Sequence, residues 1–186
     1  MGFMLRFLQV VFTITVIGHS NLLEAQTRST ASANRSISLS AGVLRYALEV
    51  DGRSTGLIAV STDYANSDRT RIEFGATYSK PRVTSSAGES SVTFSHVATL
   101  TAGVQARLSL GILRPYLGLS GGLFVRRDGD PEGVRYWKST ISVPIGIRVQ
   151  IIGPVGVRGE YRIRRDQHDF FPYESSEITA GIYWTF

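Results

Sequence analysis

The chain has 186 residues, a formal net charge of +5 and no cysteine. This length suits a single domain, and the lack of cysteine excludes disulfides, thiolate chemistry and zinc sites built on cysteine. Apolar residues make up 42% of the chain and charged residues 19%, a balance that argues against a disordered polyelectrolyte. The basic residues are 18 arginines and 2 lysines, whereas a soluble surface normally carries many lysines.

The N-terminal residues predict a secretory signal peptide. Arg6 gives a basic start, residues 7–18 form a mostly apolar run, and a short polar stretch leads to Ala25. We expect cleavage after Ala25, which makes residues 1–25 the signal peptide and residues 26–34 a flexible segment rich in Ser and Thr. The apolar run is shorter than the roughly 20 residues that a transmembrane helix needs, so a signal peptide is favoured over a membrane anchor.

From Ser36 onward apolar and polar residues alternate with period two, which is the signature of β-strands. Pro144 predicts a bulge or a break in the sixth segment, because proline cannot donate a ladder hydrogen bond. No stretch shows a sustained helical period. In chain order, the expected strands are residues 36–48, 55–64, 71–79, 92–110, 114–126, 136–151, 155–164 and 176–186.

The connections between these segments alternate in length. Short turns join the second segment to the third, the fourth to the fifth and the sixth to the seventh, while longer polar loops make the other connections. This pattern is typical of outer-membrane barrels, whose short turns lie on the periplasmic side. The sequence therefore predicts an all-β domain over residues 35–186, an eight-stranded antiparallel up-and-down transmembrane β-barrel with both ends on the short-turn side.

The polar faces of the strands indicate which side points inward. In the middle segments they carry mainly Ser, Thr, Gly and Gln, not the repeated Lys and Glu of a water-facing strand. Because buried charges persist when acids and bases pair, we expect a charge network in the barrel lumen; a solvated charged strand is the alternative. The predicted members of the network are Glu73, Arg107, Arg148, Arg158, Glu160, Arg162 and Glu177.

The C-terminal residues resemble the recognition signal of bacterial outer-membrane β-barrels. Phe186 is a terminal aromatic residue, Trp184 stands two residues before it, and Gly181 five before it. Residues 113–122 also resemble a strand start of the small eight-stranded barrels, the OmpA/OmpX-like group. The resemblance covers residues 35–186 and implies this fold, the outer membrane of a Gram-negative-type bacterium, and the barrel-assembly machinery as a partner during biogenesis. It implies no single function, because members of one fold differ in function.

Few residues offer catalytic or metal chemistry. His96 is adjacent to Ser95, but neighbouring strand residues point to opposite faces and cannot form a nucleophile–base pair. His168 lies in the last long loop, where no spacing demands an active site. The acidic loop at residues 128–132 lacks the full EF-hand pattern. We therefore expect no catalytic residue, no bound metal and no cofactor.

The expected function follows from the narrow barrel and its arginines. An eight-stranded barrel is just wide enough for side chains to fill, so we expect a monomer without a wide pore, in a structural, adhesive or envelope-integrity role. Nucleic acid is not an expected partner, because the arginines are spread along the strands. The expected partners are outer-membrane lipid and lipopolysaccharide, with the phosphates held by Arg126, Arg127, Arg164 and Arg165. The alternatives are a lipid-modifying outer-membrane enzyme and a soluble lipocalin-like periplasmic carrier.

Overall fold

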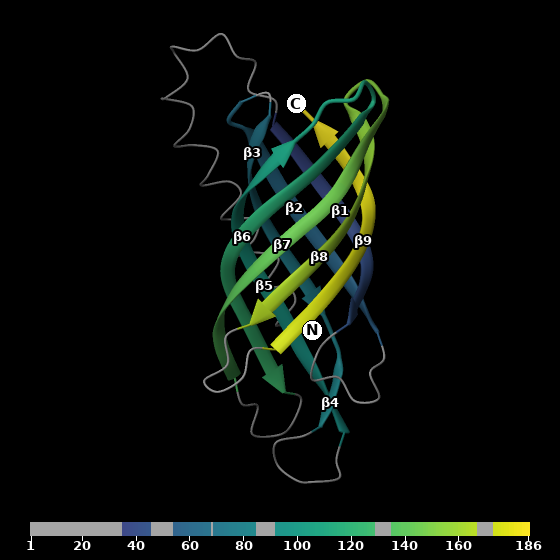
Figure 1. Ribbon diagram of the computed structural model, residues 1–186. Coiled ribbons are helices and arrows are strands. Elements are labelled where there is room, and N and C mark those ends of the chain that lie inside the picture. Colours follow the sequence, from purple (N-terminus) through teal and green to yellow (C-terminus); the bar gives the residue numbers. More distant parts are fainter. Residues whose placement is uncertain (1–34, 46–53, 68, 85–91, 129–134, 167–172) are drawn as a thin grey trace. The chain divides into compact units, whose positions relative to one another are not determined.

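The computed structural model describes residues 35–45, 54–67, 69–84, 92–128, 135–166 and 173–186. Neighbouring strands are antiparallel, and pairing of β1 with β9 and of β3 with β5 closes the sheet into a barrel (Figure 1). The predicted signal peptide and flexible segment lie outside the described residues. The strands are β1 Arg35–Arg45, β2 Thr55–Ala65, β3 Thr70–Ser79, β4 Arg82–Thr84, β5 Val92–Arg107, β6 Leu113–Asp128, β7 Arg135–Ile152, β8 Val155–Asp166 and β9 Tyr173–Thr185.

Eight of these strands form the closed wall, as the sequence predicted. The additional strand, β4, pairs only with the start of β5 and extends the β3–β5 hairpin beyond the barrel (Figure 1). The sequence analysis placed this segment in a loop. Three residues are too few to show a period of two, so β4 forms because the longer β5 offers it a partner.

The strand register sets the tilt of the barrel wall. The strand pairing can be followed from Arg35 of β1 across each neighbouring strand until it returns to β1. It returns at Arg45, so the register is displaced by ten residues around the closed sheet. With eight strands, this displacement corresponds to a tilt of about 40° from the barrel axis. Each residue then advances about 2.5 Å along the axis.

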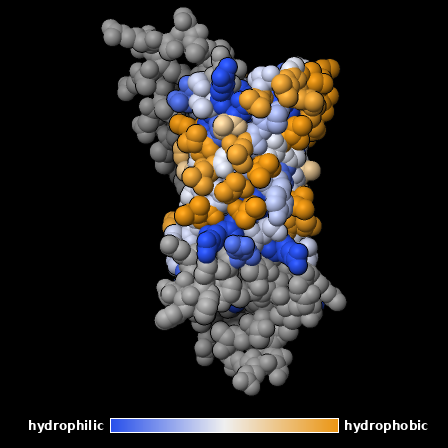
Figure 2. Space-filling model, in the orientation of Figure 1, coloured by the Kyte–Doolittle hydropathy of each residue, from blue (hydrophilic) through white to orange (hydrophobic). Residues whose placement is uncertain are grey.

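Side chains alternate between a polar lumen and an apolar outer wall. On β1, Ser36, Ser38 and Ser40 are buried inside, while Ile37 and Leu39 are exposed outside, Leu39 by 62%. The same inversion runs through the other strands and gives the barrel an apolar outer band, and Figure 2 shows this band on one face of the molecule. A soluble carrier would bury its apolar face, so the structure rejects the lipocalin-like alternative.

Both ends of the barrel chain lie at the end with the short turns. The Arg35 amide donates to the Phe186 carbonyl, and the Phe186 amide donates to the Arg35 carbonyl. The turns beside them are residues 66–69, 108–112 and 153–154. Gly111 and Gly153 have φ of 65° and 51°, a backbone conformation that favours glycine and lets the chain reverse tightly. The predicted placement of both ends on the short-turn side is therefore confirmed.

Pro144 interrupts one of its two ladders. Pairing of β6 with β7 stops after Leu117–Ile145 and resumes at Ser120–Ser142, while on its other edge Pro144 stays paired with Arg162. The break faces β6 because proline has no N–H to donate there. The predicted local break is confirmed, and a separate irregularity lies between Gln150 and Ile152.

Candidate functional site: a charged lumen and a basic outer rim

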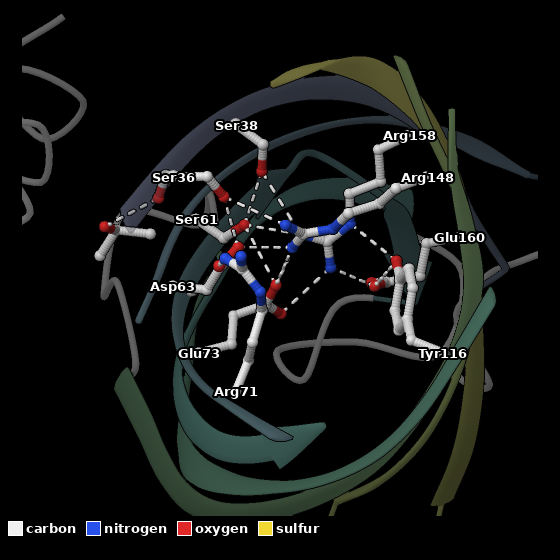
Figure 3. A network of polar contacts seen from close by, with 12 residues as sticks. Ser36, Ser38, Ser61, Asp63, Arg71, Glu73, Tyr116, Arg148, Arg158 and Glu160 are labelled. Atoms are coloured by element: carbon white, nitrogen blue, oxygen red, sulfur yellow. Dashed lines mark hydrogen bonds and ion pairs between the residues drawn. The ribbon is translucent and has the colours of Figure 1, made fainter. Parts of the chain in front are cut away.

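The lumen charges come from strand positions two residues apart. On β8, residues 158, 160, 162 and 164 all point inward, because alternate residues of a strand share a face. Facing strands supply the opposite charges, and Figure 3 shows side chains from opposite walls meeting in the middle of the barrel. Tyr116, Phe124 and Tyr183 are buried among them.

Glu73 and Glu160 are the acids at the centre of this network. Arg158 makes a bidentate contact with Glu73, with Nη1–Oε2 and Nη2–Oε1 distances of 2.6 and 3.1 Å, and also pairs with Glu160. Arg162 Nη2 lies 2.8 Å from Glu160 Oε1 and 3.4 Å from Glu73 Oε1. Tyr116 donates its hydroxyl proton to Glu160 at 2.6 Å and accepts from Arg158 Nε at 2.7 Å. Each buried charge thus has several partners.

A third acid, Asp63, lies toward the short-turn end. Arg148 Nη2 is 2.5 Å from Asp63 Oδ2, and Arg71 pairs with the other carboxylate oxygen. Ser36 donates to Asp63 at 2.6 Å and accepts from Arg148 at 3.1 Å (Figure 3). Arg148 also reaches Glu73 at 3.5 Å, so this group is continuous with the central one. At the loop end, Arg164 Nη1 is 2.5 Å from Glu177 Oε1.

The structure brings together five of the predicted lumen residues, namely Glu73, Arg148, Arg158, Glu160 and Arg162. Glu177 instead pairs with Arg164 nearer the loops. Arg107 is partly buried at the short-turn end, where its charge interacts with those of Arg71, Arg114 and Arg148 and with the carboxylate of Asp63.

The sequence analysis missed Asp63 and Arg71 as members of the network. Arg71 shares its strand face with Glu73, and Asp63 shares one with Ser61. Because alternate residues of a strand point to the same side, this spacing could have assigned Arg71 and Asp63 to the lumen. Which of these inward residues meet depends on the register, which sets Asp63 opposite Glu73. That register is not visible in either segment by itself.

The four arginines predicted to hold lipid phosphates divide between the two faces. Arg164 is 1% exposed inside the barrel, so it is not available to lipid and the prediction was wrong for this residue. Arg126 lies on the inward side, with its guanidinium 5.5 Å from the centre of the Tyr136 ring. Arg127 and Arg165 belong to the outward faces of β6 and β8. Adjacent arginines on a strand must point to opposite sides, so neither Arg–Arg pair can face lipid as a unit.

An outward-facing basic rim lies at the loop end of the apolar band, where hydrophilic side chains border it (Figure 2). Arg127 of β6 stands directly opposite Arg135 of β7, and His96 of β5 is opposite Arg127 on its other side. Trp137, 64% exposed, lies two residues below Arg135 on the same face. Arg165 has an acidic cross-strand neighbour, Glu174. The other described basic residues of the rim are Arg45, Lys80 and Arg82.

The predicted assembly residues lie on β9 and its C-terminal end. Trp184 and Phe186 project outward and are more than half exposed. Gly181 faces Ser40 of β1, and a Cβ at this position would overlap the Leu39 carbonyl oxygen. Glycine here therefore has a packing reason in the folded barrel, apart from any recognition during assembly.

Among the described residues, His96 and its neighbour Ser95 lie on opposite sides of the barrel wall. His96 accepts from or donates to the Tyr78 hydroxyl at 2.6 Å on the outer wall, whereas Ser95 is buried on the inner side. His168 lies outside the described residues, as do Asp130 and Glu132. Over the ranges that the structure covers, no group of three acidic or histidine side chains is placed to hold a metal. The described part of the chain also contains no helix long and apolar enough to cross a membrane.

No protein-family model matches the sequence, and no curated protein matches it either. Solved structures do resemble this barrel. Neisserial surface protein A is 16% identical, covering 82% of this chain and 97% of its own, with a TM-score of 0.67. The N-terminal β-barrel domain of Pseudomonas aeruginosa OprF is 14% identical, covering 83% and 100%, with a TM-score of 0.53. The Yersinia pestis attachment invasion locus protein Ail is 12% identical, covering 82% and 97%, with a TM-score of 0.50. The chain is therefore an eight-stranded transmembrane β-barrel with the fold of the small outer-membrane proteins.

Proposed function

We propose that this outer-membrane barrel is a non-enzymatic envelope anchor that binds the phosphate groups of lipopolysaccharide at its basic outer rim. The observation that carries the proposal is the cross-strand pair Arg127–Arg135 on the outer wall. Like charges directly opposite each other destabilise a sheet. A phosphate between two guanidinium groups would convert this repulsion into charge-assisted hydrogen bonds.

The position of the pair suits a lipid headgroup. Both arginines lie at the loop end of the strands, above outward-facing apolar residues such as Leu123 and Ile141. Trp137 lies between the apolar band and Arg135, where outer-membrane barrels carry an aromatic girdle. A lipid whose acyl chains cover the band would bring its phosphates to this level.

The lumen supports a structural role and not a transport role. A cavity in the middle of the barrel measures about 20 Å³ and is lined by Ser38, Ser61, Thr77, Arg158 and Glu160 among others. That volume is room for one ordered water. Arg158 and Arg162 cross the remaining space to reach Glu73 and Glu160. We therefore infer that the barrel has no wide pore and acts through its surfaces.

Adhesion through the same basic end is compatible with this role. Ail, one of the similar structures, was solved in complex with the heparin analogue sucrose octasulfate, which is a polyanion. Sulfate and phosphate present similar oxygen acceptors to arginine.

A double substitution tests the phosphate site. Arg127→Ser with Arg135→Ser should reduce the lipopolysaccharide that co-purifies with the barrel by several-fold. The control is Arg35→Ser with Arg69→Ser, which removes the same charge at the short-turn end. Equal retention of lipopolysaccharide by both variants would reject the proposal.

A further inference from the structure

The apolar wall of the barrel is taller on one side than on the other. On β7 the exposed outward aliphatic side chains run from Ile141 to Ile151, and on β6 from Leu113 to Leu123. On β1 they run only from Ile37 to Val43. At about 2.5 Å per residue, these spans measure about 25 Å on β6 and β7 and about 15 Å on β1.

The extra height extends into the short turns. The turns at residues 108–112 and 153–154 and the strand ends beside them carry large apolar side chains that project from the molecule. Leu110 is 62% exposed, Ile112 64%, Ile151 64% and Ile152 74%. Figure 2 shows this group as a projecting apolar cluster at the short-turn end of the barrel. We call Leu108, Leu110, Ile112, Ile151 and Ile152 the apolar foot.

The third short turn has the opposite character. It joins β2 to β3 and consists of polar residues, with Asn66, Ser67 and Arg69 exposed. Ser67 and Thr70 close it by a hydroxyl–hydroxyl hydrogen bond of 2.7 Å. One side of the short-turn end is thus built for water, and the other exposes a cluster of large aliphatic groups.

Continuity with the lipid-facing wall identifies what covers the foot. Ile151 continues the outward face of β7 below Ile147, without a polar residue facing outward between them. An outer-membrane barrel normally carries an apolar band of about 25 Å, a height that the β6–β7 wall reaches at Leu113 and Ile151, beside the turns. A cluster of exposed aliphatic groups at and beyond that level marks a surface that contacts hydrocarbon or another protein.

We propose that the apolar foot is embedded in the acyl chains of the inner leaflet of the outer membrane. Hydrocarbon then covers the β5–β8 side down to its turns, while the β1–β3 side presents polar groups at the same level. A difference of about 10 Å between two sides of one barrel is accommodated by tilting the barrel or by thinning the bilayer beside β1–β3. This inference is independent of the phosphate site at the other end.

Single cysteines report the surroundings of the foot, because the chain has no cysteine of its own. We would place an NBD fluorophore on Leu110→Cys, Ile152→Cys and, as the polar-turn control, Asn66→Cys. Each barrel is reconstituted in phosphatidylcholine–phosphatidylglycerol vesicles, with folding checked by heat-modifiable gel migration. Lipids carrying a nitroxide on the acyl chain serve as quenchers.

The proposal predicts blue-shifted emission and at least threefold stronger quenching at positions 110 and 152 than at position 66. Emission typical of water with quenching equal to that at position 66 would overturn it. Blue-shifted emission without quenching by the acyl-chain nitroxide would also overturn it, because the foot would then be covered by protein. Disulfide cross-linking tests whether a second barrel covers the foot instead of lipid. Efficient disulfide formation between two Leu110→Cys barrels at a low protein-to-lipid ratio would contradict a lipid covering.

Discussion

Removing the Glu73 carboxylate is the sharpest test of the lumen network. Glu73 contacts three guanidinium groups: Arg158 at 2.6 and 3.1 Å, Arg162 at 3.4 Å and Arg148 at 3.5 Å. In Glu73→Ala, Arg158 keeps Glu160, and Arg148 keeps Asp63, but the described centre of the barrel loses one of its two carboxylates. Removing one partner of a buried ion pair costs about 3–5 kcal/mol, because buried charge is then left uncompensated; here Arg158 and Arg162 would have to share the single carboxylate of Glu160.

We expect Glu73→Ala to lower the free energy of unfolding by about 3–5 kcal/mol. Urea unfolding of the barrel in lipid vesicles, followed by tryptophan fluorescence and by gel migration, measures this change. The matched control is Glu174→Ala, which removes the same charge from an exposed position of β9 and should change stability by less than about 1 kcal/mol. A loss for Glu73→Ala no larger than that of the control would refute the view that the network stabilises the barrel. A second experiment compares Glu73→Leu with the double variant Glu73→Leu, Arg158→Met. The double variant should be the more stable of the two, because replacing both partners by apolar side chains leaves less buried charge without a counter-charge.

Other consequences follow from particular contacts. In planar bilayers, wild-type barrels should show no steady conductance of the size seen for open porins, and a large conductance would contradict the closed lumen. Gly181→Ala should slow or weaken folding, because its Cβ would overlap the Leu39 carbonyl oxygen; folding kinetics unchanged from wild type would argue against this contact. Deletion of Phe186 should reduce the folded, faster-migrating band in outer-membrane fractions, whereas an undiminished band would argue against the assembly signal. Gly111→Ala should lower the free energy of unfolding by about 1 kcal/mol or more, because φ is 65° at this position. Urea unfolding of the variant measures this change.

The alternation of apolar and polar residues determines where the strands lie and which face of each strand meets lipid, without any tertiary contact. Period two along residues 36–186 predicts strands, and the small polar face beside an Ile-rich and Leu-rich face predicts which side meets lipid. These properties are local, because a strand's two faces are decided by its own residues. For the same reason Arg158, Glu160 and Arg162 could be assigned to the lumen without knowledge of their partners.

The register between strands decided what the sequence left open. It sets Asp63 opposite Glu73 and places Arg127 opposite Arg135. It also makes the two walls unequal, because the turn residues of β5–β8 project beyond the level where β1–β3 become polar. Ion pairs and surface height depend on distances between segments far apart in the chain, and one residue of slip would exchange every inner and outer side chain. Only the closed barrel therefore shows which inward charges meet and where the apolar surface ends.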